Sequence, residues 1–441
     1  EARESGMATK ADFDAVVASH VRAGGPGAAV AVRQRGELIH VAGYGLANVE
    51  WGSPIDADTV FRIGSITKQF TAAAIMRLAE AGKLSIDDPI EAHLPDYPVN
   101  GRRITVRHLL NHTSGIKSYT GLPNFFAEHS GKALTLVEMI DVFKDLPPDF
   151  GPGDKFLYNN SGYMLLGAII ETASGQDYET FLSETFFKPL GMTRTRYLHD
   201  QPIVPRRAAG YELAPKLVNA APISMNWPHA AGALGSTVND LLRWDAALRG
   251  GEVVSPASYA AMSAPGRLND GSPIRYGFGL LAGRYRDHPV IGHNGGINGF
   301  VTSLGHWPDD DLTVVLLSNI VTFPVDQAVH ALVRRALGLP DVVRTPLFLD
   351  EARLSACAGR YRFEVGPLKM TPLEGGLTSD WPRPNSRFQA IADNVFFLEK
   401  DPEVTLTFNE LRGSAYQRLS IQGYGDPVPG EREGEPAEAT T

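Results

Sequence analysis

Ser65 and Lys68 stand three positions apart, and their residue types suggest nucleophilic chemistry. A serine hydroxyl is a weak nucleophile by itself and becomes reactive when a neighbouring base takes its proton. Residues three apart on a helix share one face, so the Lys68 amine can reach the Ser65 hydroxyl. The same pattern also describes a capping serine beside a solvated lysine. An acyl-transfer site therefore requires a second proton-transfer group and an oxyanion site elsewhere in the chain.

A phenol and an amide follow at Tyr158 and Asn160, on a predicted loop between a Gly-Pro-Gly turn and an apolar helix. Side chains on such a loop can face a cleft. A lysine near a tyrosine favours the phenolate, so we expect Tyr158 to lose its proton more easily beside Lys68. The alternative is a half-buried loop tyrosine with a capping asparagine.

A third group of candidate residues is His293-Asn294-Gly295-Gly296, which follows a strand pattern at 290–292. Glycines at this position leave room for the backbone of a substrate. The N–H group of Gly296 can complete an oxyanion site with the N–H group of Ser65. The alternative is a turn at the end of a strand with a histidine at the surface.

The elements around Ser65 predict a corner between a strand and a helix. Residues 59–64 are mostly β-branched or aromatic and end in glycine, which is typical of a strand. Residues 69–81 are rich in alanine and stop at Gly82, which is typical of a helix with a glycine cap. The N-terminus of such a helix offers free N–H groups and a positive dipole end, and both stabilise an oxyanion.

The first 340 residues predict a sheet whose strands come from both ends of this region. Residues 28–33 and 37–42 predict a hairpin, whereas about 83–235 is mostly helical with connections rich in proline and glycine. We therefore expect an α/β domain with an inserted helical block. The later strands are expected at 276–280, 290–293, 299–306 and 312–318, and the clearest helices at 136–143, 162–172, 178–187, 234–248 and 326–337.

After residue 340 the pattern changes to short strands separated by turns, which predicts a separate antiparallel barrel over about 345–425. Residues 373–386 indicate a long turn within it. Residues 426–441 are rich in Pro, Gly and Glu without an apolar period, so we expect a disordered tail there. The expected fold class is thus α+β, with a first domain at 7–340 and the barrel after it.

Taken in chain order, the three groups of residues resemble the penicillin-binding-protein and class C β-lactamase superfamily, above all its branch of D-aminopeptidases and esterases. The resemblance covers about residues 12–340 and implies a β-lactamase/DD-peptidase-like sheet domain with a helical insert. The barrel is similar to the lipocalin-like domain appended to several relatives. The matching motifs are Ser65-x-x-Lys68, Tyr158-x-Asn160 and His293-x-Gly295, with further matches at 109–115, 158–163, 231–236, 276–279 and 292–296.

The resemblance implies a serine hydrolase that cleaves amide or peptide bonds through an acyl-Ser65 intermediate, like a D-aminopeptidase or amidase, with no cofactor. Lys68 and Tyr158 would move the proton as one unit, so the formal base is left open. Asn160 would hydrogen-bond both Lys68 and a small-molecule or peptide substrate. A carboxylesterase or a peptide acyl-transferase or cyclase is an alternative. A penicillin-binding sensor that is acylated without turnover is the alternative from another class.

The chain departs from the family at His293, where penicillin-binding proteins and β-lactamases usually carry a lysine that helps hold a substrate carboxylate. Histidine is shorter and largely neutral at pH 7, so we expect neutral esters and amino-acid amides to be better substrates than β-lactams. Ser224-Met225-Asn226 imitates a Ser-x-Asn element, but the flanking residues favour Tyr158. His108 and His112 imitate a metal pair without a nearby acidic ligand, so we expect structural roles for both and no metal.

Composition disfavours several other classes of protein. The 441 residues carry a net charge of −9 without a cluster of Lys or Arg, which disfavours nucleic acid and acidic membranes as partners. The one cysteine, Cys357, excludes an internal disulfide. No apolar run reaches the length of a membrane span. Met7 has no apolar signal after it, which favours a remnant at residues 1–6 and a cytoplasmic location, unless a signal peptide was removed. The oligomeric state is left open.

Overall fold

The computed structural model describes residues 8–433 except 130, 364–365, 383–384, 424 and 426. The expected remnant at 1–6 and residues 434–441 of the expected tail lie outside the described residues. The chain divides into two compact units. The first contains the described residues up to Ala282 together with His288–Gly338, and the second contains Gly283–Asp287 together with the described residues from Leu339 onward.

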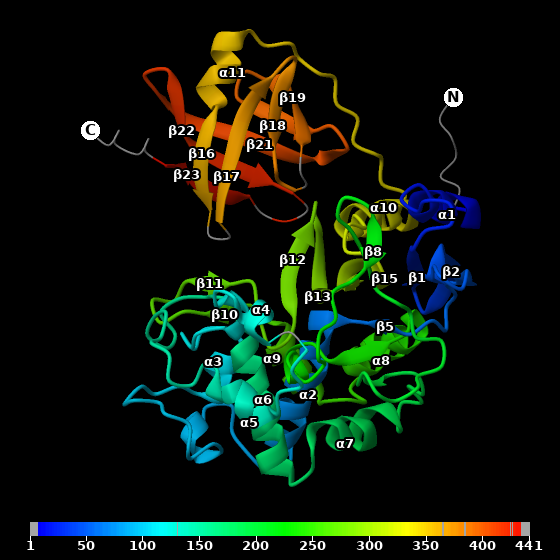
Figure 1. Ribbon diagram of the computed structural model, residues 1–441, viewed down its shortest axis with the longest axis vertical. Helices are drawn as coiled ribbons and strands as arrows, with labels where there is room; N and C mark the ends of the chain where they lie inside the picture. Colours follow the sequence, from blue (N-terminus) through cyan, green and yellow to red (C-terminus); the bar gives the residue numbers. More distant parts are fainter. Residues whose placement is uncertain are drawn as a thin grey trace. The chain divides into compact units, whose positions relative to one another are not determined.

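A six-stranded sheet, which lies in the first unit except for the end of its outermost strand, joins distant parts of the chain (Figure 1). In this sheet β1, Ala28–Gln34, pairs antiparallel with both β2, Glu37–Tyr44, and β15, Leu312–Ser318. The expectation that strands from both sides of the helical block share one sheet is therefore confirmed. Outward from β15, the other strands are β14, Phe300–Trp307, then β13, His288–Ile297, and β12, Leu281–Tyr285.

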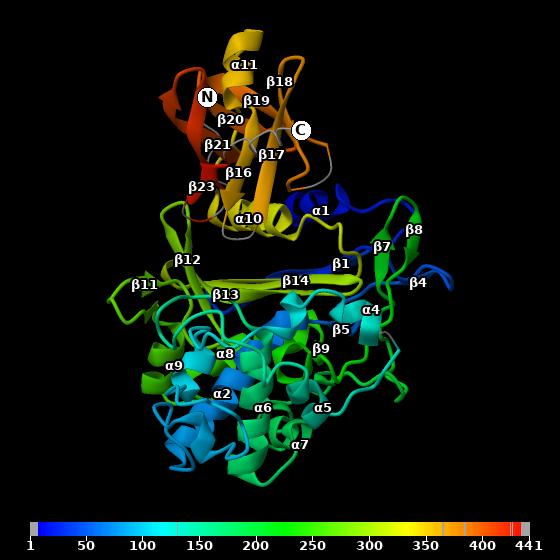
Figure 2. The same cartoon turned by 60° about the vertical axis from the view of Figure 1, so that its left-hand side comes forward.

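Helices cover both faces of this sheet, as Figure 2 shows. On one face lie α1, Lys10–Ala18, and α10, Val325–Leu337, and on the other lies α8, Val238–Gly250. Every residue of β15 is buried because helices cover the strand on both faces, and its sequence is accordingly mostly apolar. This burial fixes the register of the central strands and thereby the position of β13 beside them.

The helical block is centred on α2, Thr67–Glu80, and α6, Asn160–Ser174, which pack against each other. The α6 helix starts after Asn159, whose side-chain oxygen accepts the N–H of Gly162 at 2.9 Å. This cap fixes the loop that carries Tyr158 directly before the helix. The other helices of the unit are α3, Val106–Leu110, α4, Phe125–His129, α5, Leu136–Asp141, α7, Tyr178–Leu182, and α9, Pro256–Ser263.

Short elements connect the block with the sheet. Six of the short strands form three local pairs, β3 with β4, β7 with β8 and β10 with β11, and β5, β6 and β9 form a small sheet of three strands. The short strands are β3, Leu46–Asn48, β4, Ser53–Pro54, β5, Phe61–Arg62, β6, Arg196–Tyr197, β7, Tyr211–Leu213, β8, Leu217–Asn219, β9, Leu234–Ser236, β10, Gly266–Arg267, and β11, Pro273–Ile274. The 3-10 turns are Gly64–Ile66, Ile90–Ala92, Tyr119–Gly121, His229–Ala231 and Pro308–Asp310.

The predicted helix at 234–248 is wrong at its start, and the predicted helix at 178–187 is wrong at its end. Residues 234–236 form β9 because they pair with β5, and α8 begins only at Val238. The second helix stops at Leu182 and continues as a π-helical turn, Ser183–Phe187. Pairing with a distant strand is a tertiary effect, which the local pattern does not reveal.

The predicted strand at 276–280 is a loop in the structure. Gly279 has a φ of +69°, and a Cβ atom there would stand 2.4 Å from the carbonyl oxygen of Lys68. The glycines thus let this loop pack closely against the start of α2, which an extended strand would not do. The other strands predicted for the first unit, at 290–293, 299–306 and 312–318, are confirmed within β13, β14 and β15.

The second unit contains a closed antiparallel barrel of eight strands, which confirms the lipocalin-like barrel expected from the sequence. Its core is a separate cluster that includes Tyr361, Phe388 and Phe408. One helix, α11, Glu351–Cys357, precedes it. The strands are β16, Gly359–Phe363, β17, Gly366–Leu373, β18, Gly376–Ser379, β19, Ser386–Ala392, β20, Val395–Leu398, β21, Asp401–Arg412, β22, Ala415–Gln422, and β23, Val428–Arg432.

Two boundaries in this unit differ from the prediction. Residues 428–432, expected in a disordered tail from 426, form β23, which pairs with β16 and β22. Residues 373–386, expected as one long turn, contain the strand β18. Both segments are weak in local pattern and become strands because the closing barrel supplies partners on each side.

Candidate active site

Ser65 lies in the 3-10 turn Gly64–Ile66, between β5 and α2, as the sequence predicts. Gly64 has a φ of +52°, and a Cβ atom there would stand 2.9 Å from the backbone nitrogen of Gly296. Both backbone polar groups of Ile63 are hydrogen-bonded. Its N–H donates to the Leu234 carbonyl at 3.0 Å, and its carbonyl accepts from Thr302 Oγ1 at 2.9 Å. The corner that presents Ser65 is therefore fixed by the sheet.

Lys68 is completely buried, and its Nζ lies within hydrogen-bond distance of three oxygens. These are Ser65 Oγ at 3.0 Å, Asn160 Oδ1 at 2.8 Å and the Ala231 carbonyl oxygen at 2.8 Å. Burial lowers the pKa of Lys68 well below its ordinary value. A neutral amine has two N–H bonds and one lone pair. The two carbonyl oxygens can only accept, so the lone pair is left for the Ser65 hydroxyl.

Tyr158 lies against the same lysine, but its protonation state differs from the prediction. Lys68 Nζ stands 4.7 Å from the centre of the Tyr158 ring, over its face. Burial raises the pKa of Tyr158, and the nearby Ser65 hydroxyl lowers it only in part. The expectation that Lys68 favours the phenolate is therefore wrong for the resting site: Tyr158 is a protonated phenol, which can donate a proton.

The position of the Tyr158 hydroxyl is unusual. It is buried, and among the described residues it has no hydrogen-bond partner of regular geometry, although Ser65 lies close enough to influence it. A buried hydroxyl normally has a partner, because an unsatisfied one loses its hydration without compensation. The hydroxyl therefore stands next to the nucleophile with its hydrogen-bonding capacity unused.

Asn160 connects the lysine to a neighbouring turn. It is the first residue of α6, and its side-chain oxygen accepts from Lys68 while its amide nitrogen donates to Thr120 Oγ1 at 3.2 Å. Its backbone N–H donates to Ser118 Oγ at 3.3 Å. The hydrogen bond to Lys68 that the sequence analysis expected is present, and the Thr120 contact orients the amide so that its oxygen faces the amine.

Gly295 and Gly296 belong to β13, and their surroundings differ. A Cβ atom at Gly295 would stand 2.0 Å from the Ile63 carbonyl oxygen and 2.3 Å from Thr302 Oγ1, so only glycine fits there. Gly296 is exposed, and a Cβ atom there would have no neighbour within 4 Å among the described residues. The strand thus closes against the Ser65 corner at one glycine and leaves open space at the next.

His293 is buried on the same strand, and both of its ring nitrogens have partners within the protein. Nδ1 lies 2.5 Å from the Asn294 carbonyl oxygen, which can only accept, so Nδ1 carries the proton. Nε2 then accepts from the Tyr276 hydroxyl at 2.8 Å. Burial, and the charge that Lys68 carries when protonated, lower the pKa of His293 to about 3. The ring is therefore neutral, and both of its nitrogens are engaged within the protein.

Sequence reasoning missed two partners of the site. The Ala231 carbonyl that accepts from Lys68 is a backbone group, so no residue type reveals it. Tyr276, which donates to His293, lies in the segment predicted as a strand. Its Tyr-Gly-Phe-Gly pattern is a signal that could have indicated the loop, since two glycines in five residues are unusual for a strand.

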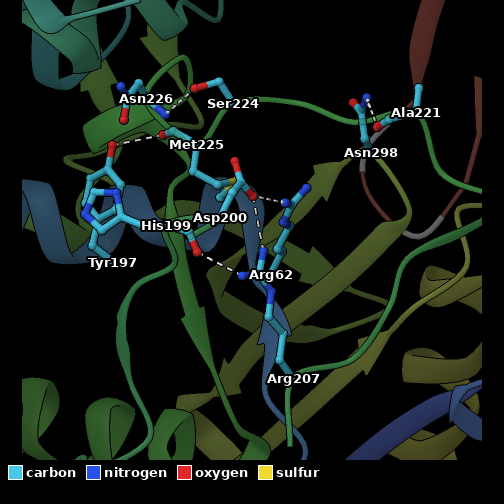
Figure 3. A network of polar contacts seen from close by, with 10 residues as sticks. All are labelled: Arg62, Tyr197, His199, Asp200, Arg207, Ala221, Ser224, Met225, Asn226 and Asn298. Carbon is cyan, nitrogen blue, oxygen red and sulfur yellow. Dashed lines mark hydrogen bonds and ion pairs between the residues drawn. The ribbon is translucent and has the colours of Figure 1, made fainter. Parts of the chain in front are cut away.

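The Ser224-Met225-Asn226 segment, which imitates a Ser-x-Asn motif, forms a turn of its own. In residues 221–226 the Asn226 N–H donates to Ser224 Oγ at 3.4 Å, which is a local turn (Figure 3). The same figure shows Asn298 from the β13–β14 turn donating to the Ala221 carbonyl at 3.0 Å. Within the described part of the chain, no three His, Cys, Asp or Glu residues gather as a metal site, and no helix is long and apolar enough to cross a membrane.

Two known sequences resemble this chain over most of its first unit. Penicillin-binding protein 4* of Bacillus subtilis is 32% identical over 308 residues, which cover 66% of this chain and 67% of that protein. The D-aminopeptidase of Gluconobacter oxydans is 29% identical over 336 residues, which cover 74% of this chain and 62% of that enzyme. The chain thus spans less than two thirds of the length of this second relative.

Solved structures resemble it as well. The octameric penicillin-binding protein homologue of Pyrococcus abyssi matches 96% of this chain and 99% of its own, with a TM-score of 0.69 and 25% identity. The D-amino acid amidase of Ochrobactrum anthropi SV3, solved with L-phenylalanine amide, matches 75% and 97%, with a TM-score of 0.65 and 28% identity. The β-lactamase family model matches residues 13–339. With three quarters of its length matched by that model, this chain belongs to the β-lactamase family.

Proposed function

We propose that the protein is a serine hydrolase that cleaves amide or peptide bonds through an acyl-Ser65 intermediate. The observation that carries the proposal is the hydrogen bonding of Lys68. In the neutral form of the amine, its contacts with Asn160 Oδ1 and the Ala231 carbonyl take both N–H bonds. Its lone pair then faces the Ser65 hydroxyl at 3.0 Å, as a general base requires.

In the proposed reaction Ser65 Oγ attacks the substrate carbonyl carbon while its proton passes to Lys68. Negative charge then develops on the carbonyl oxygen, and the N–H groups of Ser65 and Gly296 stabilise it. The C–N bond breaks as the Tyr158 phenol protonates the leaving amine, and the proton held by Lys68 restores the phenol. Water then attacks the acyl ester while its proton passes to Lys68. The bond between the acyl group and Ser65 Oγ breaks, and Ser65 Oγ takes that proton back, which frees Ser65.

The substrate class rests on the relatives and on His293. One relative is named a D-aminopeptidase and one structural neighbour a D-amino acid amidase, so amides of D-amino acids are the first candidates. His293 is neutral and has both ring nitrogens engaged, so it offers no cation to a substrate carboxylate. An unpaired carboxylate buried beside it would be unfavourable, so we expect β-lactams such as nitrocefin to be poor substrates.

A labelling experiment and a substrate panel test the proposal. A fluorophosphonate probe should modify Ser65, and Ser65→Ala should lose both labelling and turnover while its circular dichroism stays unchanged. The panel contains D- and L-amino-acid amides and p-nitroanilides, p-nitrophenyl esters and nitrocefin. Turnover confined to esters would indicate a carboxylesterase, and transfer to added amines an acyl-transferase. Stoichiometric acylation by penicillin without steady hydrolysis would indicate a sensor. Turnover by folded Ser65→Ala would reject the proposal.

A further inference from the structure

His112 lies beside Tyr158 and has no part in the proton transfers proposed above. The sequence pairs it with His108, but the two rings have separate partners. His108 Nδ1 accepts the Thr105 N–H at 3.2 Å, which completes the cap of α3. The ring of His112 instead lies in the buried aromatic cluster of the site, with 1% of the residue exposed.

His112 holds the chain on both sides of Tyr158. Its carbonyl oxygen accepts the N–H of Leu157 at 3.0 Å, and its ring Nδ1 accepts the N–H of Asn159 at 3.0 Å. Its ring also packs against the Tyr158 ring, with 4.4 Å between the two centres. The residue before Tyr158, the residue after it and the phenol ring therefore all contact this one histidine.

The backbone of His112 is strained in a way that fits this arrangement. Its φ is +61°, in the left-handed region that residues other than glycine seldom occupy. Strained backbone persists where the surrounding contacts determine it, and here the contacts are the two hydrogen bonds to the segment around Tyr158. The conformation lets the carbonyl and the ring of a single residue bind the same segment.

The ring of His112 has to be neutral to do this. Nδ1 accepts from the Asn159 N–H, so the proton is on Nε2. The Nε2–H group is buried and has no hydrogen-bond partner within the described part of the chain. Burial, with the charges that Lys68 and His293 carry when protonated, lowers the pKa of His112 well below its ordinary value, which keeps Nδ1 free to accept.

We infer that His112 is a positioning residue that fixes the Tyr158 phenol next to Ser65, acting through the hydrogen bond to Asn159. Among the described residues the hydroxyl of Tyr158 has no hydrogen-bond partner of regular geometry, so the approach of Ser65 alone does not fix the tip of the phenol. Its position must come from the backbone and the ring, and these are the parts that His112 contacts. The inference rests on the proposed function, in which Tyr158 donates a proton to the leaving group.

Two substitutions separate the hydrogen bond from the backbone strain. Asparagine and glycine both accept a positive φ, but only asparagine carries an acceptor oxygen close to the place of Nδ1. His112→Gly should lower kcat by about 10–100-fold with KM changed by less than about threefold, the scale expected when a reacting group moves by about 1 Å. His112→Asn should recover most of that loss. His108→Asn, on the short helix α3 that ends just before His112, serves as the matched control.

The decisive measurement repeats both substitutions in the Tyr158→Phe background. If His112 acts through the phenol, His112→Gly should cost less than about threefold in kcat there, because the group it positions is already gone. Equal losses in the two backgrounds, or a glycine variant as fast as the asparagine variant, would overturn the inference. If His112→Gly does not fold, His112→Asn is compared with wild type in both backgrounds, and the same coupling decides.

Failure of the proposed function can be distinguished from failure of the role of His112 alone. Wild-type protein that neither labels at Ser65 nor turns over any substrate of the panel would reject that function and the role of His112 with it. Wild-type protein that labels and turns over, with His112 variants whose losses are independent of Tyr158, would reject only the role of His112.

Discussion

Lys68 and Gly296 both border the Ser65 corner, and their surroundings are opposite in character. The lysine is completely buried and its Nζ has three oxygen partners between 2.8 and 3.0 Å. The glycine is exposed, and no atom lies within 4 Å of the place that a Cβ atom would take. The groups that would move protons are thus held from several sides, whereas the strand edge that would receive a substrate is left open.

The difference follows from what each side has to do. A buried amine is unfavourable unless polar partners replace its hydration, so Lys68 needs oxygens from α6 and from the turn at 229–231. These partners also fix its direction, which a base needs before the substrate arrives. A strand edge that accepts a substrate needs free space and unobstructed N–H groups, and glycine provides both. The first side depends on contacts, and the second depends on missing side chains.

Removing a proton-transfer group from the buried side of the site, around Lys68, should have the largest effect on the rate. Lys68→Ala and Tyr158→Phe should each lower kcat by on the order of 10²–10⁴, the usual range for general acid–base groups. Because the two act on one proton path, the double variant should be little slower than the slower single variant. Steady-state kinetics on the best amide of the panel measures this. Losses that multiply in full would show that the two groups act independently.

The two neighbouring glycines of β13 allow a direct comparison of a closely packed position, Gly295, with an open one, Gly296. Gly295→Ala would place a Cβ atom 2.0 Å from the Ile63 carbonyl oxygen, so the strand or the Ser65 corner must move. We expect a loss of stability of about 1–3 kcal/mol, the usual range for overpacking, and loss of Ser65 labelling.

Gly296→Ala meets no atom and should keep the thermal midpoint of the wild type. Its methyl group would project into the open space, so KM should rise for bulky acyl groups more than for small ones. Thermal unfolding and probe labelling of both variants measure the difference. If the two variants were equally stable, the close approach of β13 to the corner would have no energetic weight.

The local part of the site follows from the sequence. The Ser65–Lys68 contact is present because spacing along a single helix is a local property, and the strand-to-helix corner has an equally local pattern. The protonated state of Tyr158 depends on burial by residues far away in the chain, so the sequence suggested the opposite. The partners of His293 depend on where the loop at 276–280 lies, and that loop was predicted as a strand.

The fold divides in the same way. The hairpin at 28–42 and the buried strand at 312–318 were predicted because each has a strong local pattern. Residues 234–236 and 428–432 were assigned wrongly because each becomes a strand only through partners from distant segments. Local propensity is a weak guide for segments that become strands only through a tertiary contact.

The charge state of His293, which lies on β13 with Gly296, depends in part on Lys68 and so links the open and the buried side of the site. Its pKa of about 3 in the folded protein lies below the value of roughly 6.5 expected for an unfolded chain. Between these values the unfolded chain binds more protons, so the protein should lose stability as the pH falls from 6.5 towards 3. His293→Asn removes this titration. Its stability relative to wild type should rise by on the order of 2 kcal/mol between pH 7 and pH 4.5.

Unfolding midpoints of wild type and variant at several pH values test this prediction. Protonated Lys68, the form present at low pH, also lowers the pKa of His293, so Lys68→Met should move the NMR titration of His293 to higher pH. Parallel pH curves for wild type and His293→Asn would contradict the neutral assignment of the ring. An unmoved titration in Lys68→Met would remove the link between the two sides.

The smallest expected effect concerns the barrel, which has its own hydrophobic core. A chain truncated after Pro340 keeps the whole core of the first unit, including α2, α6 and the central sheet, so it should fold and label at Ser65. We expect its kcat/KM to change by less than about tenfold for small amides, since the proton-transfer groups all belong to the first unit. Selectivity within the panel should change more than the rate for the smallest substrate. Loss of labelling together with loss of the folded state would show that the first unit depends on the barrel for stability, and an unchanged profile across the panel would exclude the barrel from substrate selection.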